Sequence, residues 1–239
     1  MNNDIYKKSF SLFLRRTDEK SVIKHFIRDN IPIVKKIDFL DIGGGDGSLT
    51  SVISKEARTT LVVEPNHSFN KELSTRRKIK VLNEKWENIQ LNNTFDFILA
   101  AYVITYFPKN KIRRLIRKMY ALLRPGGYIL ILSVDARMGS WRKVHTYFYK
   151  LISRKHHSSD ITLSQIARKY KAVSKSFKTK VISKDVNEML DILKFDFHKY
   201  PKDYSKYSRK LITFLNRYAD RNGKIALEMV HNAYIITKK

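Results

Sequence analysis

The chain has 239 residues, 43% of them hydrophobic, which is enough for a full core and excludes global disorder. It contains no cysteine, which excludes disulfides, thiolate metal ligands and cysteine nucleophiles. Forty-eight basic residues against 22 acidic ones give a net charge of +26, which can attract polyanions, although a lysine-rich proteome also produces basic proteins without such partners. Charge alone therefore leaves a nucleic-acid partner open.

No apolar run approaches the roughly 18 residues of a membrane span. The N-terminus is charged and amphipathic, without the apolar core of a signal peptide. We therefore expect a cytoplasmic protein that does not span a membrane.

The N-terminal part is predicted to be helical. Residues 4–29 contain two helices, because apolar side chains recur with helical spacing in each half. These side chains are Ile5, Phe10, Phe13 and Leu14 in the first helix and Val22, Ile23, Phe26 and Ile27 in the second. Pro32 marks the break after them.

The period then changes to short apolar runs that are typical of buried strands. The runs are "KIDFLDI", "TTLVVEP", "KIKVLN", "FDFILAAYV" and "GYILILSV". A glycine-rich loop leads into a helix after the first run, and a helix closed by Pro125 and two glycines precedes the last. Strands that alternate with helices predict an α/β fold with a doubly wound, mostly parallel sheet, whose ligands bind at the carboxyl ends of the strands.

The pattern is looser after Ser133. Residues 154–184 hold nine basic residues and one acidic residue, and we interpret this weakly periodic stretch as an insertion or lid. "SKDVNEMLDIL" predicts a helix with Ser183 as N-cap, and "KFDFHKY" alternates as a strand does. "YSRKLITFLNRYADRNG" predicts a helix that ends at Gly223, and "KIALEMVHNAYIITKK" predicts a terminal hairpin.

The loop after the first predicted strand, Asp41 to Gly47, has the form D-x-G-x-G-x-G. Glycines at these spacings permit the turn and remove side chains that would block a ligand. Glu64 ends the next strand, where a carboxylate can accept both hydroxyls of a ribose. Both features predict a nucleotide-sized ligand, but dinucleotide enzymes share them.

The order of features over residues 37–135 distinguishes a dinucleotide site from other nucleotide-sized sites. Asp41 precedes the glycines, the fourth strand begins "FDFIL" and the fifth is introduced by "LLRPGGYILIL". This ordered set resembles the class I S-adenosylmethionine-dependent methyltransferases. The resemblance implies a Rossmann-like fold, S-adenosylmethionine as cofactor, S-adenosylhomocysteine as product, and no metal.

In that family the glycine loop contacts the methionine part and the ribose, the acidic residue holds the ribose hydroxyls, and the segment after the third strand flanks the adenine. The resemblance thus implies that the cofactor is bound by Asp41, Gly43, Gly44, Gly45, Asp46, Gly47, Glu64, Pro65, Lys85, Trp86, Glu87, Ala101 and Tyr102. Glu84 is a further candidate, which residue meets the adenine stays open, and Trp86 also suits an ordinary core position.

Several acceptor classes lose support. Methylation at C5 of cytosine or uracil proceeds through a cysteine adduct in its known families, and this chain has no cysteine. The site after the fourth strand, Ala100 to Val103, lacks the prolines of the adenine and glutamine nitrogen methylases. Metal-assisted catechol methylation needs clustered acidic ligands, and none is evident.

Residues 6–32 and the glycine loop resemble the histamine N-methyltransferase family, in the pattern Y-x-x-S-F-x-x-F-L followed by T/S, E and F-x-x-x-x-I/L-P. The resemblance continues through "VVEP", "GSWRKVH" and "ISKDVNEML", and it is broken by residues 154–180. It implies a small-molecule acceptor, most readily an amine nitrogen.

The resemblance assigns five substrate-positioning residues, which are Glu19, Tyr102, Tyr106, Trp141 and His145. Glu19 matches a glutamate that grips the substrate's ammonium, Tyr106 an aromatic at the cleft edge, and Trp141 and His145 two tryptophans. Tyr102 replaces a glutamine that contacts imidazole, which departs from a histamine site. A C-terminal asparagine of the family falls near Glu228 or Asn232.

Other roles for these residues stay open. Glu19 suits the first turn of its helix, and Trp141 suits a core position. His145 can serve as a base or as an ordinary satisfied histidine.

We expect one methyltransferase domain over residues 1–239 with a seven-stranded sheet. Its parts are an N-terminal helical lid (1–34), a cofactor-binding core (35–135), and a region with substrate-side helices, the basic insertion and the terminal hairpin (136–239).

The alternative function is methylation of tRNA or rRNA. It is favoured by the charge of +26, by the basic stretch 154–180, and by residues 199–210, where tyrosines interleave with lysines. The missing base-methylation motifs and the lack of a recognisable RNA-binding module disfavour it. The oligomeric state stays open.

Overall fold

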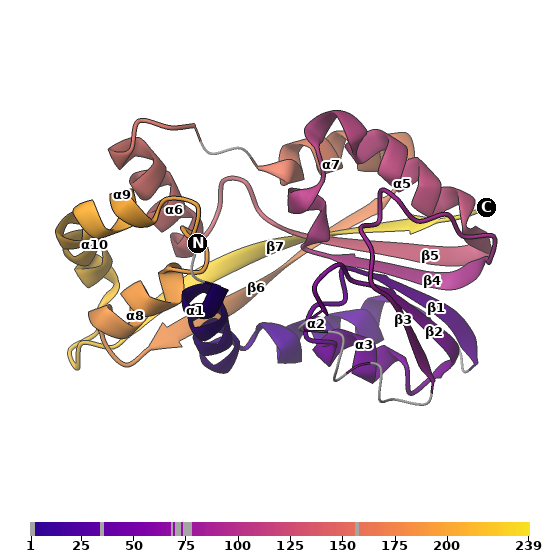
Figure 1. Ribbon diagram of the computed structural model, residues 1–239, viewed down its shortest axis with the longest axis horizontal. Helices are drawn as coiled ribbons and strands as arrows, with labels where there is room; N and C mark the ends of the chain where they lie inside the picture. Colours follow the sequence, from indigo (N-terminus) through magenta and orange to yellow (C-terminus); the bar gives the residue numbers. More distant parts are fainter. Residues whose placement is uncertain (1–2, 34–35, 68, 70–72, 74–77, 156–157) are drawn as a thin grey trace. The chain divides into compact units, whose positions relative to one another are not determined.

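The computed structural model describes residues 3–33, 36–67, 69, 73, 78–155 and 158–239. The chain divides into two compact units. Unit 1 consists of Met1–Glu19, Asp135–His157 and Lys178–Val230, and unit 2 of Lys20–Val134, Ser158–Phe177 and His231–Lys239. Strands β6 and β7 continue from one unit into the other (Figure 1). The single domain over residues 1–239 stays a prediction.

The described residues form a seven-stranded sheet in the order β3-β2-β1-β4-β5-β7-β6 (Figure 1). Its strands are β1 (Ile37–Ile42), β2 (Ala57–Val63), β3 (Ile79–Leu82), β4 (Phe95–Ala101), β5 (Leu123–Val134), β6 (Val173–Ser183) and β7 (Ile225–Thr237). The first five strands pair in parallel, whereas β7 runs antiparallel to β5. The predicted seven-stranded α/β sheet is confirmed, but the sheet is mixed rather than purely parallel.

Helices cover both faces of the sheet in unit 2. They are α2 (Glu19–Asn30), α3 (Ser48–Ile53), α5 (Ile112–Ala121) and α7 (Ser159–Lys169), with the short 3-10 turns η1 (Val103–Tyr106) and η2 (Lys109–Lys111). Successive residues of a strand point to opposite faces. Leu40 therefore packs with residues of α5 and α7, and Phe39 packs with residues of α2 and α3. This burial on both faces explains the apolar residues of β1 on both sides, while its two aspartates, Asp38 and Asp41, are held by hydrogen bonds.

The helices of unit 1 enclose an aromatic core. They are α1 (Asn3–Arg16), α6 (Ser140–Leu151), α8 (Val186–Leu193), α9 (Pro201–Lys206), α10 (Ser208–Leu215) and the turn η3 (Asn216–Tyr218). The rings of Phe13 and Phe195 have centroids 4.8 Å apart, and those of Phe148 and Phe197 are 4.2 Å apart. The two predicted N-terminal helices are confirmed as α1 and α2.

Residues 154–184 contain more regular structure than their weak periodicity indicated, and their interpretation as an insertion or lid stays a prediction. Helix α7 buries Leu163, Ile166 and Ala167 in the core of unit 2, and β6 is an edge strand of the sheet. The basic side chains Arg168 and Lys169 lie on the exposed side of the helix. The many charged residues made this short amphipathic helix hard to recognise in the sequence, because only one face of such a helix needs apolar residues.

The C-terminal segment is one strand and not a hairpin. Strand β7 stays extended through His231 and Asn232, which pair with Val134 and Ser133 of β5. An asparagine after a histidine can suggest a turn, but here the ladder with β5 satisfies the backbone without one.

Three smaller predictions are also wrong. Asp185, not Ser183, is the N-cap of α8, because its carboxylate accepts a hydrogen bond of 2.8 Å from the amide of Glu188. Residues 194–200 form turns instead of a strand, and Phe195 and Phe197 both contribute to the aromatic core. Pro125 and its glycines lie at the start of β5 and not at the end of α5.

Over the described residues, no helix combines the length and apolar character needed to cross a membrane.

An ion cluster connects strand β1 to its surroundings at the amino end. Asp38 accepts hydrogen bonds from Arg58 Nε (3.0 Å), Thr59 Oγ1 (2.8 Å) and Arg124 Nη2 (2.7 Å). Arg124 also donates to Asp96 at 2.7 Å. The hydrogen bond from Arg58, with those from Thr59 and Arg124, holds the pKa of Asp38 well below its usual range despite its burial.

We predict that Asp38→Asn lowers the free energy of unfolding at pH 7 by about 2 kcal/mol, because the guanidinium groups lose their carboxylate. A lowered folded pKa stabilises above the unfolded pKa, and this stabilisation is lost as the pH falls. Urea unfolding at pH 7 and pH 3 should therefore show a difference between wild type and variant that shrinks in acid. Asp29→Asn is the control, since its pair with Arg28 is exposed and should change stability by less than about 0.5 kcal/mol. A pH-independent difference would contradict the assignment.

Candidate functional site

The loop after β1 is compressed against its neighbours in unit 2. Gly43, Gly45 and Gly47 have φ angles of 76°, 53° and 70°, which favour glycine. A Cβ atom on Gly43 would lie 2.7 Å from Cγ2 of Val103, so a side chain does not fit there. At Gly45 the nearest atom to such a Cβ is 4.0 Å away. The loop thus lies against Val103 of η1 and leaves open space at Gly45.

Glu64, directly after β2, is hydrogen-bonded to this loop. Its side chain is buried, and Oε2 accepts from the amide of Gly45 at 3.0 Å. Oε1 accepts from the amide of Asn66 at 2.9 Å. A carboxylate offers about four acceptor positions, so two backbone bonds are compatible with further hydroxyl donors. The structure therefore brings together the two features that the sequence singled out.

Two aspartates fix the loop from opposite sides. Asp41 is buried and accepts a bond of 2.5 Å from Thr50 Oγ1 of α3. Burial, with the nearby charge of Glu64, raises the pKa of Asp41 to about 7. Asp46 forms an ion pair with Lys20 of α2. Burial opposes ionisation there, but the hydrogen bonds from Lys20 and Ser48 lower the pKa of Asp46 overall.

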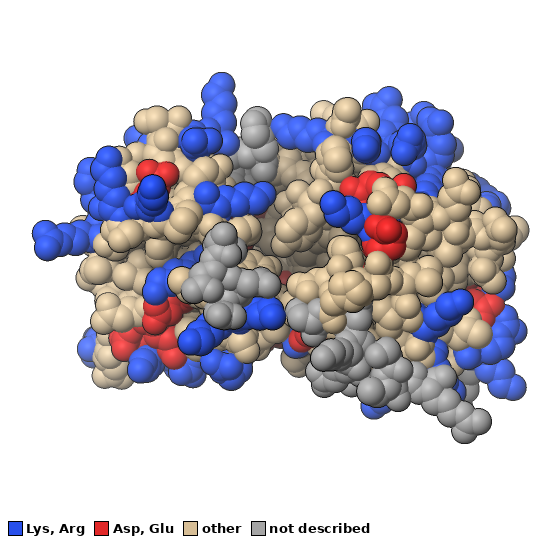
Figure 2. All heavy atoms as spheres, viewed as in Figure 1, with Lys and Arg blue, Asp and Glu red and all other residues tan. Residues whose placement is uncertain are grey.

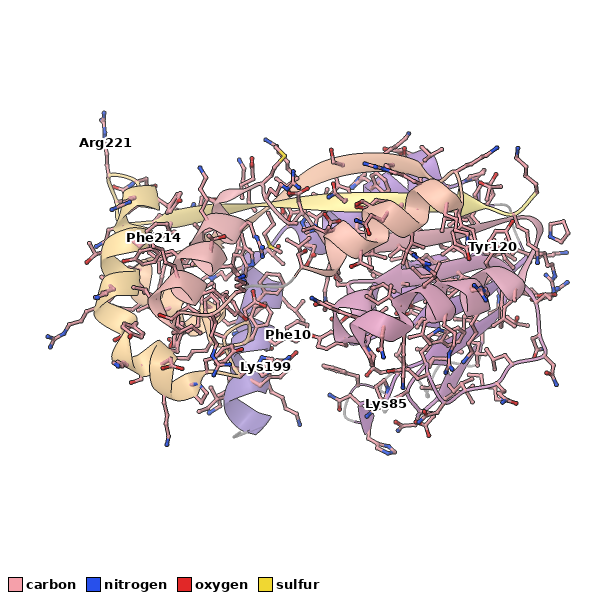
Figure 3. All side chains as sticks on the ribbon, turned by 90° about the horizontal axis from the view of Figure 1, so that it is seen from above. Phe10, Lys85, Tyr120, Lys199, Phe214 and Arg221 are labelled. Carbon is pink, nitrogen blue, oxygen red and sulfur yellow. The ribbon has the colours of Figure 1, made fainter. Side chains whose placement is uncertain are left out.

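The segment predicted to flank an adenine surrounds a buried tryptophan. Trp86 packs in the core with Ile42 and Val63, whereas Lys85 lies at the surface of unit 2 (Figure 3). The ammonium of Lys118 donates to the carbonyl of Trp86 at 2.7 Å and lies 4.1 Å from the centre of its ring. The core position of Trp86 is confirmed.

The other predicted cofactor residues lie around the same edge of unit 2. Pro65 and Glu84 are exposed, Glu87 is half-buried, and Ala101 ends β4. Their contacts with a cofactor stay predictions.

Tyr102 has a partner that the sequence did not indicate. It follows β4 with a φ of 59°, and its hydroxyl lies 2.8 Å from Nδ1 of His231 on β7. His231 is fully buried and its ring stacks on Phe177 with centroids 4.9 Å apart. Burial lowers the pKa of His231 to about 4, so the imidazole is neutral at pH 7. Val103, the residue after Tyr102, lies close to Gly43, so the backbone of Tyr102 is near the glycine loop while its hydroxyl reaches β7.

A buried carboxylate lies at the same end of the sheet but on its other face. Asp160 of α7 accepts hydrogen bonds from Ser133 Oγ (2.6 Å), Tyr234 OH (2.7 Å) and Asn232 Nδ2 (3.1 Å). Asn232 follows His231 on β7, and Ser133 faces it on β5. The one signal in the sequence was that Asp160 is the single acid in a basic stretch. His231 and Asp160 are therefore candidate site residues that the sequence analysis missed.

The remaining predicted substrate residues divide between the units. Trp141 and His145 both contact Oδ2 of Asp196 in unit 1, at 3.1 and 2.7 Å. Trp141 is 3% exposed and belongs to the aromatic core. Glu19, the first residue of α2, is buried, and its amide donates to Thr17 Oγ1 at 3.2 Å.

Tyr106 of unit 2 is 68% exposed. Glu228 of unit 1 pairs with Lys178 at 3.1 Å, whereas Asn232 belongs to the Asp160 cluster of unit 2. Substrate contacts by any of these residues stay predictions.

Within the ranges that the structure describes, no three His, Asp or Glu side chains gather closely enough to hold a metal ion.

A protein-family model described as "Methyltransferase domain" matches residues 15–171. YcgJ from Bacillus subtilis has a similar structure, with 16% identity, a TM-score of 0.61, and coverage of 90% of this chain and 98% of that one. A putative methyltransferase from an antibiotic biosynthesis pathway of Anabaena variabilis has 14% identity and a TM-score of 0.61, with coverages of 88% and 96%. The N-methyltransferase NodS from Bradyrhizobium japonicum, in complex with S-adenosyl-L-homocysteine, has 11% identity and a TM-score of 0.53, with coverages of 95% and 98%. These likenesses show a shared fold, and a search of curated proteins found no match.

We predict that Gly43→Ala destabilises unit 2 more than Gly126→Ala does. Both glycines have a φ of 76°, but a Cβ on Gly126 would meet nothing within 4 Å. Gly126→Ala should therefore cost only the backbone term of about 1–2 kcal/mol, and Gly43→Ala about 1–3 kcal/mol more because of Val103. Urea unfolding measures both. Equal losses, or no recovery when Val103→Ala is added to Gly43→Ala, would show that the loop does not press on Val103.

Proposed function

The chain belongs to the methyltransferase domain family and is an S-adenosylmethionine-dependent methyltransferase, and on this premise we propose that its acceptor is the nitrogen of a small-molecule amine. The site in unit 2 supports this proposal in two parts, a nucleotide-binding loop and the polar groups at the ends of the neighbouring strands. NodS, which shares the fold, is an N-methyltransferase, and we extend nitrogen methylation to this chain only as part of the proposal.

The first part concerns the cofactor. The open space at Gly45 fits a ligand that passes close to the backbone, and Glu64 stands next to it as an acceptor for ribose hydroxyls. Asp41 and Asp46 hold the loop in this shape through Thr50 and Lys20. The bound cofactor supplies a methyl group that is already activated by its sulfonium. The protein then has to align the acceptor and exclude water.

The second part concerns the acceptor, and it rests on one observation. Near the carboxyl ends of β4 and β5, the Tyr102 hydroxyl and the neutral imidazole of His231 lie on the sheet face of α2, and the buried carboxylate of Asp160 lies on the face of α7. These groups accept hydrogen bonds or carry negative charge, so they suit an acceptor with N–H groups or a positive charge. These groups therefore favour an amine over a polyanionic acceptor.

In this proposal Tyr102 positions the acceptor. The imidazole of His231 is neutral at pH 7 and carries a single N–H. Its contact with the Tyr102 hydroxyl fixes the direction of that hydroxyl. Asp160 in turn accepts a hydrogen bond from Asn232, the residue that follows His231 in the chain. Catalysis by this cluster consists of alignment rather than proton abstraction, which agrees with a reaction whose cofactor carries the activation.

We predict that Glu64→Gln weakens the binding of S-adenosylhomocysteine by about tenfold or more, because a charge-assisted acceptor for the ribose hydroxyls is lost. Isothermal titration calorimetry measures the effect. Glu56→Gln is the matched control, since Glu56 is exposed on the same strand-helix unit, and it should stay within about twofold of wild type. Unchanged affinity in Glu64→Gln would remove Glu64 from the cofactor site.

We predict that the enzyme transfers a labelled methyl group to members of a panel of small primary and secondary amines and not to tRNA or rRNA fragments. Tyr102→Phe should lower kcat/KM for the best amine by about tenfold or more and leave cofactor affinity unchanged. Tyr120→Phe is the control, because this tyrosine of α5 packs on Tyr170 elsewhere in unit 2 (Figure 3). Label that appears only in RNA would refute the amine proposal, and equal activity of both variants would exclude Tyr102.

A further inference from the structure

Unit 1 contains a basic pocket that the proposed methylation does not use. Its volume is about 460 Å³. It is formed by the last turn of α1, the end of β6 and the loop before β7, which can be followed in Figure 1. The lining residues are Arg15, Arg16, Ile182, Ser183, Lys184, Asn222 and Lys224. Four of these seven side chains are cationic and none is acidic, although they come from three separate segments of the chain.

The nearby acids neutralise only part of this charge. Glu188 accepts from Arg16 Nη2 at 2.7 Å and Nε at 3.2 Å, and it also accepts from the backbone amide of Lys184. Asp220 accepts from the backbone amides of Asn222 and Lys224. Arg16 is thus held in a fixed direction by its carboxylate, while Asp220 shapes the loop.

Among the described residues, none of the other three cations has a carboxylate at hydrogen-bond distance, although the charge of Lys184 also acts on Glu188 from further away. Arg15 donates to Ser11 Oγ at 3.3 Å, and in the described part of the chain no carboxylate lies within ion-pair distance of Arg15, Lys184 or Lys224. Like charges that share one concave surface create a positive potential that a bound anion relieves.

General basicity does not explain the arrangement. Lys and Arg side chains are spread over the surface of both units (Figure 2), and Arg221, in the same loop as Asn222, extends away from the protein (Figure 3). Basic residues in the last turn of a helix are favoured by its dipole, which accounts for Arg15 and Arg16. It does not account for Lys184 and Lys224, which follow other elements and converge on the same cavity.

We propose that this pocket binds the phosphate group of a phosphomonoester. Guanidinium groups match phosphate oxygens in pairs, and ammonium groups add point charges around them. A phosphomonoester carries close to two negative charges, so it offsets the repulsion among the three unpaired cations better than a carboxylate does. The volume lies within the range of small-molecule sites and leaves room for an organic group beside the phosphate.

The test measures the binding of inorganic phosphate by isothermal titration calorimetry. Sodium chloride keeps the ionic strength constant. Arg15→Gln/Lys224→Gln should weaken phosphate binding by about tenfold or more, and Lys184→Gln alone by a smaller factor. Lys7→Gln/Lys8→Gln is the matched control. It removes two charges from exposed positions of the same helix outside the pocket, and it should stay within about twofold of wild type. Arg16 is left unchanged because it pairs with Glu188.

Two results would overturn the proposal. One is an equal loss of phosphate affinity in Lys7→Gln/Lys8→Gln, because the effect would then depend on net charge and not on the pocket. The other is retention of a single-stranded RNA oligomer by a wild-type protein that does not bind phosphate, since the surface would then serve a polyanion instead. The Lys184→Gln variant keeps the test decisive if the double variant fails to fold. Because no methyl transfer is measured, the outcome is independent of the acceptor proposed above.

Discussion

The hydrogen bond from the Gly45 amide to the Glu64 carboxylate is the contact on which the site in unit 2 depends. It connects the loop after β1 to the end of β2, two neighbouring parallel strands. The bond can form only because the loop turns through left-handed glycines and lies close against Val103. One carboxylate thus fixes the shape of the loop and also stands where a ribose would bind.

The charges inside unit 2 are arranged differently from those on its surface. At the amino end of β1, Asp38 lies among two arginines and its pKa is lowered. At the carboxyl end, Asp41 is buried and bonded to the uncharged hydroxyl of Thr50, and its pKa is raised. A chain with a net charge of +26 therefore keeps acidic and neutral groups around the edge where its ligands are expected. Net charge alone is a poor guide to the acceptor for this reason.

The core of the fold was predictable because its local signals agree with one another. Short apolar runs, a glycine loop and the break at Pro32 all indicate alternating strands and helices, and the sheet confirms them. The prediction failed after Ser133, where the amphipathic face of α7 is short and surrounded by lysines and arginines. The hairpin was wrong for a related reason, because strand β7 is continuous only through its pairing with β5.

The sequence by itself determined the glycine loop, its acidic partner and the parallel strands that carry them, since these depend on residues within about one strand-helix-strand unit. Only the tertiary structure decided which groups stand at the ends of the neighbouring strands. Tyr102 meets His231 from 129 residues away, and Asp160 meets Asn232 from 72 residues away. Both contacts depend on the register between β5 and β7, because a shift of one residue would move each of His231 and Asn232 to the face that the other now occupies. No local pattern in the chain encodes that register.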